Sequence, residues 1–167
     1  IDVSDPAHPT QVAIYAGLSN SLRGGGIAVA NGYAYVGHWS RIVILDITDP
    51  RRPGEVEQIY PYIGVVVKIM TMGHYAFGLG QFGELVVSDV SDPHHPLLLP
   101  GFDTYGEPTG LVAAPPLPGQ EIPLAYVASG SRGLQVVSWA DPTHPVRHAE
   151  YDLPGNAYGV AVAMTPD

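Results

Sequence analysis

Histidine has the widest chemical repertoire of the residue types in this 167-residue sequence, and it occurs seven times. His8, His95 and His144 occupy the same place in a short motif, Asp-Pro-x-x-Pro, that recurs along the chain. A metal site needs several ligands that converge on one point, whereas equivalent positions of a repeat are held apart by the repeat itself. We therefore expect these imidazoles to serve local turns and expect no metal site, and the adjacent pair His94 and His95 has no further ligands beside it.

His38 differs because its position does not recur. It stands beside Trp39, Ser40 and Arg41 between two apolar runs. Connecting segments of repeat proteins carry binding residues more often than the elements that they join. Trp, Tyr and Arg suit protein hot spots and stacking contacts with peptides or sugars. The candidate ligand- or partner-binding residues are those that break the repeat in such segments: Arg23, His38, Trp39, Arg41, Tyr62, Tyr105, Glu107, Arg132 and Tyr158.

No motif in the sequence enforces a catalytic geometry. Gly-x-Ser-x-Gly and His-Glu-x-x-His are both absent, and Gly24-Gly25-Gly26 leads into an apolar run of strand character rather than a helix. We therefore assign no catalytic residue. The sequence favours a binding protein over an enzyme.

Charge and composition exclude several partners. Lys68 and six Arg stand against 16 acidic residues, for a net charge of -9, so neither nucleic acid nor an anionic membrane surface is expected as a partner. No run of about 18 apolar residues exists, so we expect no membrane insertion. The absence of cysteine excludes a disulfide framework, a thiol nucleophile, Cys-ligated zinc and covalently attached haem. We expect no cofactor.

The elements that position the candidates are set by the Asp-Pro-x-x-Pro motif. It occupies residues 5–9, 49–53, 92–96 and 141–145, at Asp-to-Asp spacings of 44, 43 and 49 residues. The Asp side chain and the first Pro favour a β-turn, and the second Pro starts an extended segment. A period of this length is typical of a repeat architecture. We treat residues 1–167 as a single repeat domain.

Each repeat contains four short apolar segments. Residues 31–32, Asn-Gly, predict a two-residue hairpin turn between two of them. The predicted strands are residues 11–15, 26–30, 33–37, 41–46, 56–60, 64–70, 75–79, 84–89, 97–102, 110–114, 124–128, 133–138, 146–151 and 159–163. Four such strands in about 43 residues match one blade of a β-propeller. A β-sandwich would not repeat one turn at this spacing.

Several runs also resemble the LVIVD-repeat family. They are Ile-Val-Ile-Leu-Asp at 42–46 and Leu-Val-Val-Ser-Asp at 85–89, each before the turn, with Asn-Gly-Tyr-Ala-Tyr-Val at 31–36 and Tyr-Asp-Leu-Pro-Gly at 151–155. The sequence departs from the pattern at Ser138, where the motif has Asp, and Trp139 follows it. The resemblance implies a β-propeller in an exported or cell-surface protein, and it implies no single activity.

The number of repeats bears on how the fold closes. Propellers typically close with about four to eight blades, and the four turns mark three full blades with parts of another. An open arc exposes apolar blade faces and unpaired strand edges. We therefore expect all-β blades of four antiparallel strands in an incomplete ring. The chain is then a segment of a longer propeller, or another chain completes the ring.

Three functions follow from these observations. The favoured one is a non-catalytic scaffold or binding module, extracellular, periplasmic or at the cell surface, that engages a protein partner or a glycan. A propeller lyase or hydrolase with His38 and a tyrosine near the axis is the first alternative. A structural subunit of a surface assembly is the second.

Overall fold

The computed structural model describes residues 1–18, 24–114 and 122–163, and it contains only β-strands as regular structure within these ranges. The strands are β1 (Ile27–Ala30), β2 (Tyr33–His38), β3 (Arg41–Asp46), β4 (Gly54–Ile59), β5 (Val66–Met72), β6 (Tyr75–Gly80), β7 (Glu84–Asp89), β8 (Leu97–Leu98), β9 (Phe102–Asp103), β10 (Gly110–Ala114), β11 (Leu124–Ala128), β12 (Leu134–Ser138) and β13 (Val146–Tyr151). They form three antiparallel sheets: β1 to β4, β5 to β9, and β10 to β13. We call these sheets blades 1, 2 and 3.

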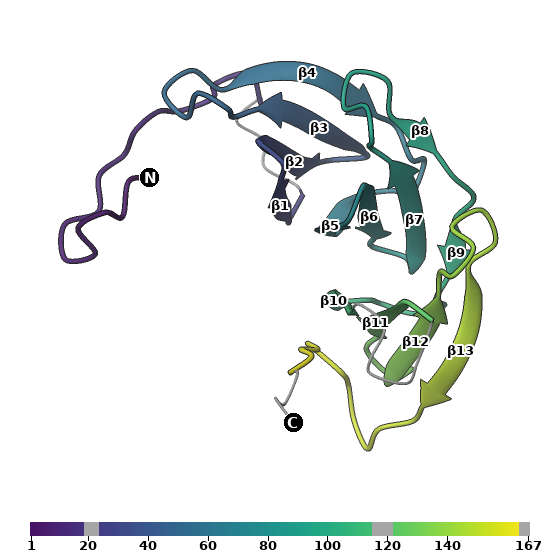
Figure 1. The fold of residues 1–167 in the computed structure, drawn as a ribbon. Helices are drawn as coiled ribbons and strands as arrows, with labels where there is room; N and C mark the ends of the chain where they lie inside the picture. The colour runs from purple at the N-terminus through teal and green to yellow at the C-terminus, as the bar shows by residue number, and fades with distance from the viewer. Residues whose placement is uncertain (19–23, 115–121, 164–167) are drawn as a thin grey trace.

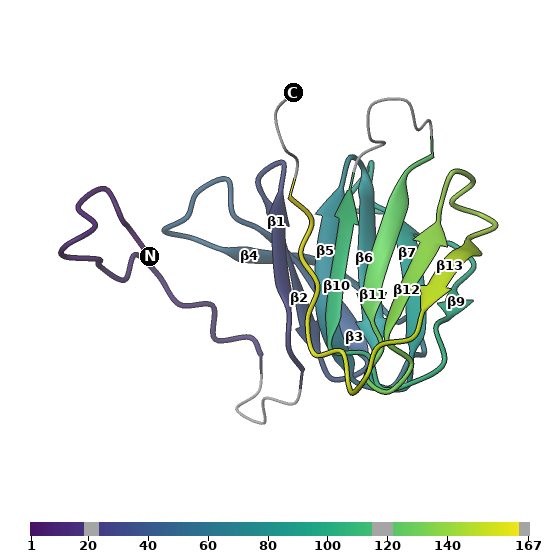
Figure 2. The same cartoon turned by 90° about the horizontal axis from the view of Figure 1, so that it is seen from below.

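The blades stand side by side around an open centre, as Figure 1 shows. Strands β1, β5 and β10 are innermost, whereas β4, β8, β9 and β13 lie at the outside. This is the arrangement of an incomplete β-propeller, as the repeat predicts. Figure 2 shows the two ends of the blades. One end carries the turns between the first and second and between the third and fourth strands of the blades, among them the β1–β2 and β12–β13 turns, and we call it the turn face. The opposite end carries the loops between the second and third strands and the connections between blades, and we call it the loop face.

The repeated turns are held by their aspartates. In all four Asp-Pro-x-x-Pro motifs the first Asp accepts a hydrogen bond from the backbone N–H two residues on, at 2.9–3.0 Å. Asp46 and Asp89, which end β3 and β7, do the same for Thr48 and Ser91. Ser138 takes this role in blade 3 with a longer contact of 3.5 Å to the Ala140 N–H. Two successive side-chain-capped turns therefore end the third strand of each blade.

The core lies between the blades. One buried cluster, which includes Ile42, Ile44, Ile69 and Val86, joins blades 1 and 2. A second, which includes Phe77, Leu85, Val127 and Trp139, joins blades 2 and 3. Each blade thus buries its β-branched and aromatic side chains against its neighbours, which is why no single repeat is a stable unit.

Three strand predictions were wrong, each at an outer or terminal position. Residues 11–15 and 159–163 form no strand, because neither pairs with a strand of the three sheets that the described residues form. The predicted strand 97–102 is split into β8 and β9, with Leu99, Pro100 and Gly101 between them. Proline has no N–H to donate to a ladder, so the outer strand of blade 2 breaks there. The Pro-rich segment 115–123, which separates β10 from β11, lies mostly outside the described residues.

The outward face of blade 1 is apolar, and the part of it formed by β1 is open. Ile27 on β1 is opposite Val36, and Ile69 on β5 is opposite Gly78, so the two isoleucines hold equivalent positions. Ile69 is 7% exposed against blade 1, whereas Ile27 is 64% exposed. This difference is what the incomplete ring predicts. The part of the chain that the structure describes has no helix long and apolar enough to cross a membrane.

Candidate functional site

The loop face is tied together by backbone hydrogen bonds that repeat from blade to blade. The Val66 N–H donates to the Trp39 carbonyl at 2.8 Å, and the Thr104 N–H donates to the Gly83 carbonyl at 2.8 Å. Gly130 and Ala157 exchange two such bonds, at 3.2 and 2.9 Å. Each connection between blades is thereby fastened to the loop between strands two and three of the blade before it. The face is a rigid platform for its side chains.

Three large aromatic residues on this platform have a left-handed backbone. Trp39, Tyr62 and Tyr105 have φ of 55°, 58° and 46°. Residues with a Cβ rarely adopt the left-handed region of φ, because it costs about 1–2 kcal/mol relative to the right-handed region. Strain of this kind concentrates at binding and catalytic sites. All three residues were candidates from the sequence, and the structure shows them exposed at 40%, 90% and 56%.

Phe82 is a further exposed aromatic residue of the loop face and was not among the predicted residues. It lies in the β6–β7 loop and is 66% exposed, and its ring lies over Gly64, two residues after Tyr62 in the chain. Tyr158 adds a further exposed aromatic side chain at 73%. The alignment of repeats could have indicated Phe82, because it falls in the same loop of blade 2 as Trp39 in blade 1. We call Trp39, Tyr62, Phe82, Tyr105 and Tyr158 the loop-face aromatics.

The conformation of Tyr105 has identifiable supports. Its N–H donates to the Asp103 carboxylate at 2.7 Å. From blade 3, the fully buried Gln135 donates through its side-chain amide to the Thr104 carbonyl and, at 3.5 Å, to the Tyr105 carbonyl. The Arg147 guanidinium lies 5.6 Å from the Tyr105 ring centroid and 5.8 Å from that of Phe102. Gln135 and Arg147 are positioning residues that sequence reasoning missed, since only the fold brings them to this loop.

His38 has a different environment from the aromatics. It is 4% exposed, and its Nδ1 accepts a hydrogen bond of 3.2 Å from Nε of Arg41. Arg41 in turn donates to the Gln58 side chain at 2.8 Å. A histidine with this burial is not available to touch a substrate or partner at the surface. The pair His38 and Arg41 braces the β2–β3 loop that carries Trp39.

The remaining candidates lie on the same face without forming one cavity. The Arg132 guanidinium is 3.9 Å from the Glu150 carboxylate, and Arg147 approaches the same carboxylate at 2.9 Å. Glu107 is exposed, and its backbone lies against Gly130. Arg23 lies outside the described residues. An open hollow of about 450 Å³ is lined by Tyr105 and Arg147 together with residues 101–103.

The turn histidines pair with their own aspartates. Nδ1 of His8, His95 and His144 lies 2.8, 2.8 and 3.1 Å from the second carboxylate oxygen of Asp5, Asp92 and Asp141. These contacts hold the pKa of Asp5 and Asp92 below the usual carboxyl range, and for Asp141 the Thr143 hydroxyl contributes first. Within the described residues, no three His, Asp or Glu side chains gather in a metal-binding arrangement.

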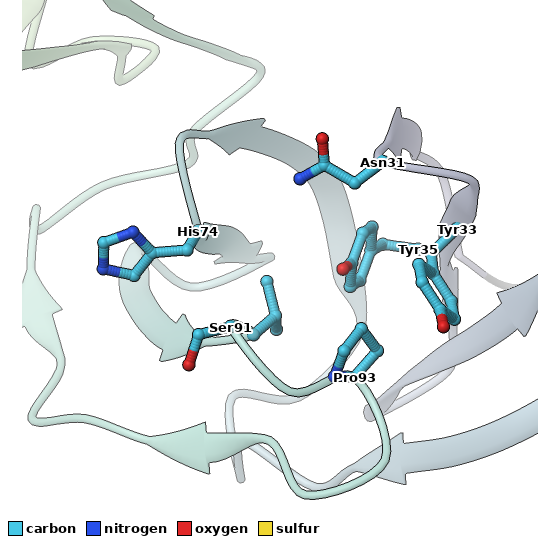
Figure 3. Close-up of a pocket in the computed structure, with 7 residues that line it drawn as sticks. Asn31, Tyr33, Tyr35, His74, Ser91 and Pro93 are labelled. Carbon is cyan, nitrogen blue, oxygen red and sulfur yellow. The ribbon is translucent and has the colours of Figure 1, made fainter.

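A second concave feature lies on the turn face, between blades 1 and 2. Figure 3 shows Asn31 and two tyrosines on one side of it and His74 and Ser91 on the other. Its volume is about 320 Å³, and Asn31, Tyr33, Tyr35, His74, Val90, Ser91 and Pro93 line it. No residue of this pocket was a candidate from the sequence.

Comparisons with known proteins agree with this architecture. The LVIVD repeat pattern matches residues 1–17, 24–60, 63–104 and 124–152, well over half of the chain. The computationally designed Ika4 protein is similar in fold, with a TM-score of 0.66 at 11% identity over 94% of this chain and 89% of that one. Sqt1 of Saccharomyces cerevisiae is similar with a TM-score of 0.64 at 9% identity, and this chain spans 36% of its length. A search among curated proteins found no match. At these identities the solved structures show the fold alone.

Proposed function

The chain belongs to the LVIVD repeat family, and on that premise we propose that it is a non-catalytic β-propeller module that binds a protein partner through its loop face. The observation that carries the proposal is the set of loop-face aromatics. Three of them hold a strained backbone conformation, and five expose large apolar rings to solvent. Aromatic residues of this kind are typical hot spots of protein interfaces.

The spread of these side chains supports a protein rather than a small ligand. They come from the loops of all three blades, and no single cavity collects them. A rigid surface with aromatic anchors loses little conformational entropy on binding, since its backbone is already fixed.

Catalysis finds less support in the geometry. The enzyme alternative needs His38 to reach a substrate, and His38 is 4% exposed with its Nδ1 facing Arg41. General acid–base catalysis requires the residue to lie within hydrogen-bond reach of the reacting proton. Replacing His38 by Ala is therefore expected to lower the stability of the fold and not to abolish a catalytic activity.

The same proposal places the module outside the cytoplasm or at the cell surface. It rests on the family resemblance, together with a cysteine-free chain whose folding does not depend on the redox state of the compartment. Protease accessibility on intact cells tests it: the protein is expected to be cleaved without lysis, and protection until lysis would contradict the placement.

The binding proposal is tested with matched surface variants. Proteins captured from the source organism by the full chain are identified, and the dissociation constant of each purified candidate partner is then measured. Tyr62→Ser and Phe82→Ser are each expected to weaken the affinity for the true partner by about 30-fold. The control is Tyr151→Ser on β13, where Tyr151 is 58% exposed, and it is expected to leave the affinity unchanged. A partner that binds all three variants as tightly as the unmodified chain would contradict a role for the loop face.

A further inference from the structure

The three blades allow one position to be compared directly. In each blade the residue that follows the third strand donates its N–H to the carbonyl that precedes the second strand. Ile47 donates to Gly32 at 2.9 Å, Val90 to His74 at 2.8 Å, and Trp139 to Pro123 at 3.2 Å. Ile47, Val90 and Trp139 are therefore equivalent, and Val90 and Trp139 each face the blade before their own.

Between blades 2 and 3, Trp139 fills the space at this position. Its indole packs edge-on against Tyr75 and Phe77, with ring centroids 5.6 and 4.9 Å away and interplanar angles of 75° and 73°. Trp139 is 8% exposed and Phe77 is fully buried. The fold thus accommodates an indole ring between two aromatic walls at the turn face.

Between blades 1 and 2, the same walls are present without the indole. Tyr33 and Tyr35 are equivalent to Tyr75 and Phe77, because each pair occupies the first and third positions of the second strand. Val90 stands where Trp139 stands in the next interface. The smaller side chain leaves the pocket of about 320 Å³ that Figure 3 shows, which is at the lower end of the range for ligand pockets, about 300–1,000 Å³.

The polar groups of this pocket suit a ring with a hydrogen-bonding edge. Tyr35 is 2% exposed, burial raises the pKa of its hydroxyl, and no residue that the structure describes donates to or accepts from that hydroxyl. Asn31, His74 and Ser91 are exposed at the rim. The lining contains neither a carboxylate nor an Arg or Lys side chain, so a neutral ligand fits it better than an ion.

We propose that this pocket binds a neutral heteroaromatic ring of indole type, in the place that Trp139 fills between blades 2 and 3. The ring packs against Tyr33 and Tyr35, and the Tyr35 hydroxyl accepts a hydrogen bond from the ring N–H. Aromatic rings bury about 150–250 Å² each and gain from edge-to-face contacts of the kind that Trp139 makes. The site is on the face opposite the loop-face aromatics and is independent of the partner proposed for them.

The experiment measures binding to the full chain by calorimetry, with free indole, N-acetyl-L-tryptophanamide and methyl β-D-glucopyranoside as probes. Val90→Trp fills the pocket from within and is expected to abolish binding while keeping or raising the unfolding temperature. Tyr35→Phe removes one hydroxyl and is expected to weaken binding about fivefold. Tyr126→Phe changes the equivalent tyrosine of blade 3 and is expected to leave binding unchanged. If Val90→Trp fails to fold, the contrast between Tyr35→Phe and Tyr126→Phe decides.

Binding of free indole alone would support the proposal with a small molecule as the natural ligand. Binding of the tryptophan amide as well would support it with a tryptophan side chain of a protein as the ligand. The proposal is overturned if neither indole probe binds, if only the glucoside binds, or if Tyr35→Phe and Tyr126→Phe bind equally well.

Discussion

At the scale of single residues, the loop face combines strain with exposure. Trp39, Tyr62 and Tyr105 have a backbone conformation that glycine adopts at no steric cost, yet their side chains are large. Packing does not explain the identity of Tyr62, because its side chain is 90% exposed. A binding role explains why a bulky ring is kept where a glycine would be less strained.

This argument predicts opposite effects of one substitution on stability and on binding. Tyr62→Gly is expected to be more stable than Tyr62→Ala by about 0.5–1 kcal/mol, because glycine relieves the strain at φ 58° that alanine retains. Both variants are expected to lose affinity for the partner equally. Urea unfolding measures the first quantity, and a Tyr62→Gly variant less stable than Tyr62→Ala would contradict the account.

Gln135 provides a second prediction at this scale. Its side-chain amide is fully buried and donates to the carbonyls of Thr104 and Tyr105. Gln135→Leu leaves the Thr104 carbonyl without this donor, so the unfolding free energy is expected to fall by about 1–3 kcal/mol. Amide hydrogen exchange around Tyr105 is expected to rise as well. An unchanged exchange rate there would show that Gln135 does not position the loop.

At the scale of elements, the Asp-Pro-x-x-Pro turns respond to pH through their aspartates, whose pKa values are lowered. The His95 imidazole is the largest cause that holds the pKa of Asp92 below its ordinary value, so the turn is stabilised while this carboxyl is ionised. That contribution is complete above the unfolded-state pKa, about 3.9, and is lost as the pH falls through the lowered folded-state value. His95→Ala is expected to raise the pKa of Asp92, and carboxyl NMR titration measures it. Asp5, in a separate turn, serves as the control, and an unmoved Asp92 would contradict the assignment.

The elements also show what the sequence could and could not predict. The Asp-Pro-x-x-Pro spacing and Asn31-Gly32 predicted the inner strands well, since their signals are local: φ is 52° and 82° at that turn. The predictions of terminal strands at 11–15 and 159–163 were wrong, because strand formation there depends on pairing with strands of further blades. Two features depend on contacts between blades and could not be predicted. One is the positioning of Tyr105 by Gln135 and Arg147, and the other is the turn-face pocket. An alignment of the repeats places Val90 opposite Trp139 and shows that the side chain is smaller in blade 2. Only the structure shows that Trp139 fills a space between blades, so that the smaller Val90 leaves a pocket.

At the scale of the whole molecule, the described arc leaves part of one apolar blade face uncovered, at β1, whereas Tyr15 and Leu18 pack against the rest of it. Blade 1 turns Ile27 and Val29 outward at 64% and 60% exposure, next to the cluster of Ala34, Val43 and Leu45. At about 25 cal/mol for each Å² of apolar surface, burying such a face is a strong drive for association. We expect a further blade, from the same chain or from another, to cover it as blade 1 covers Ile69.

Thiol accessibility tests this closure most directly, because the chain has no cysteine of its own. Ile27→Cys, Ile69→Cys and Val146→Cys are each introduced into the full natural protein, and alkylation by iodoacetamide is followed by mass spectrometry. Ile69 is 7% exposed and Val146 is 55% exposed, so they give the protected and the reactive limits. The closed ring predicts that Ile27→Cys reacts about tenfold more slowly than Val146→Cys, close to Ile69→Cys. Reaction at the rate of Val146→Cys would show an uncovered blade and would contradict closure of the ring.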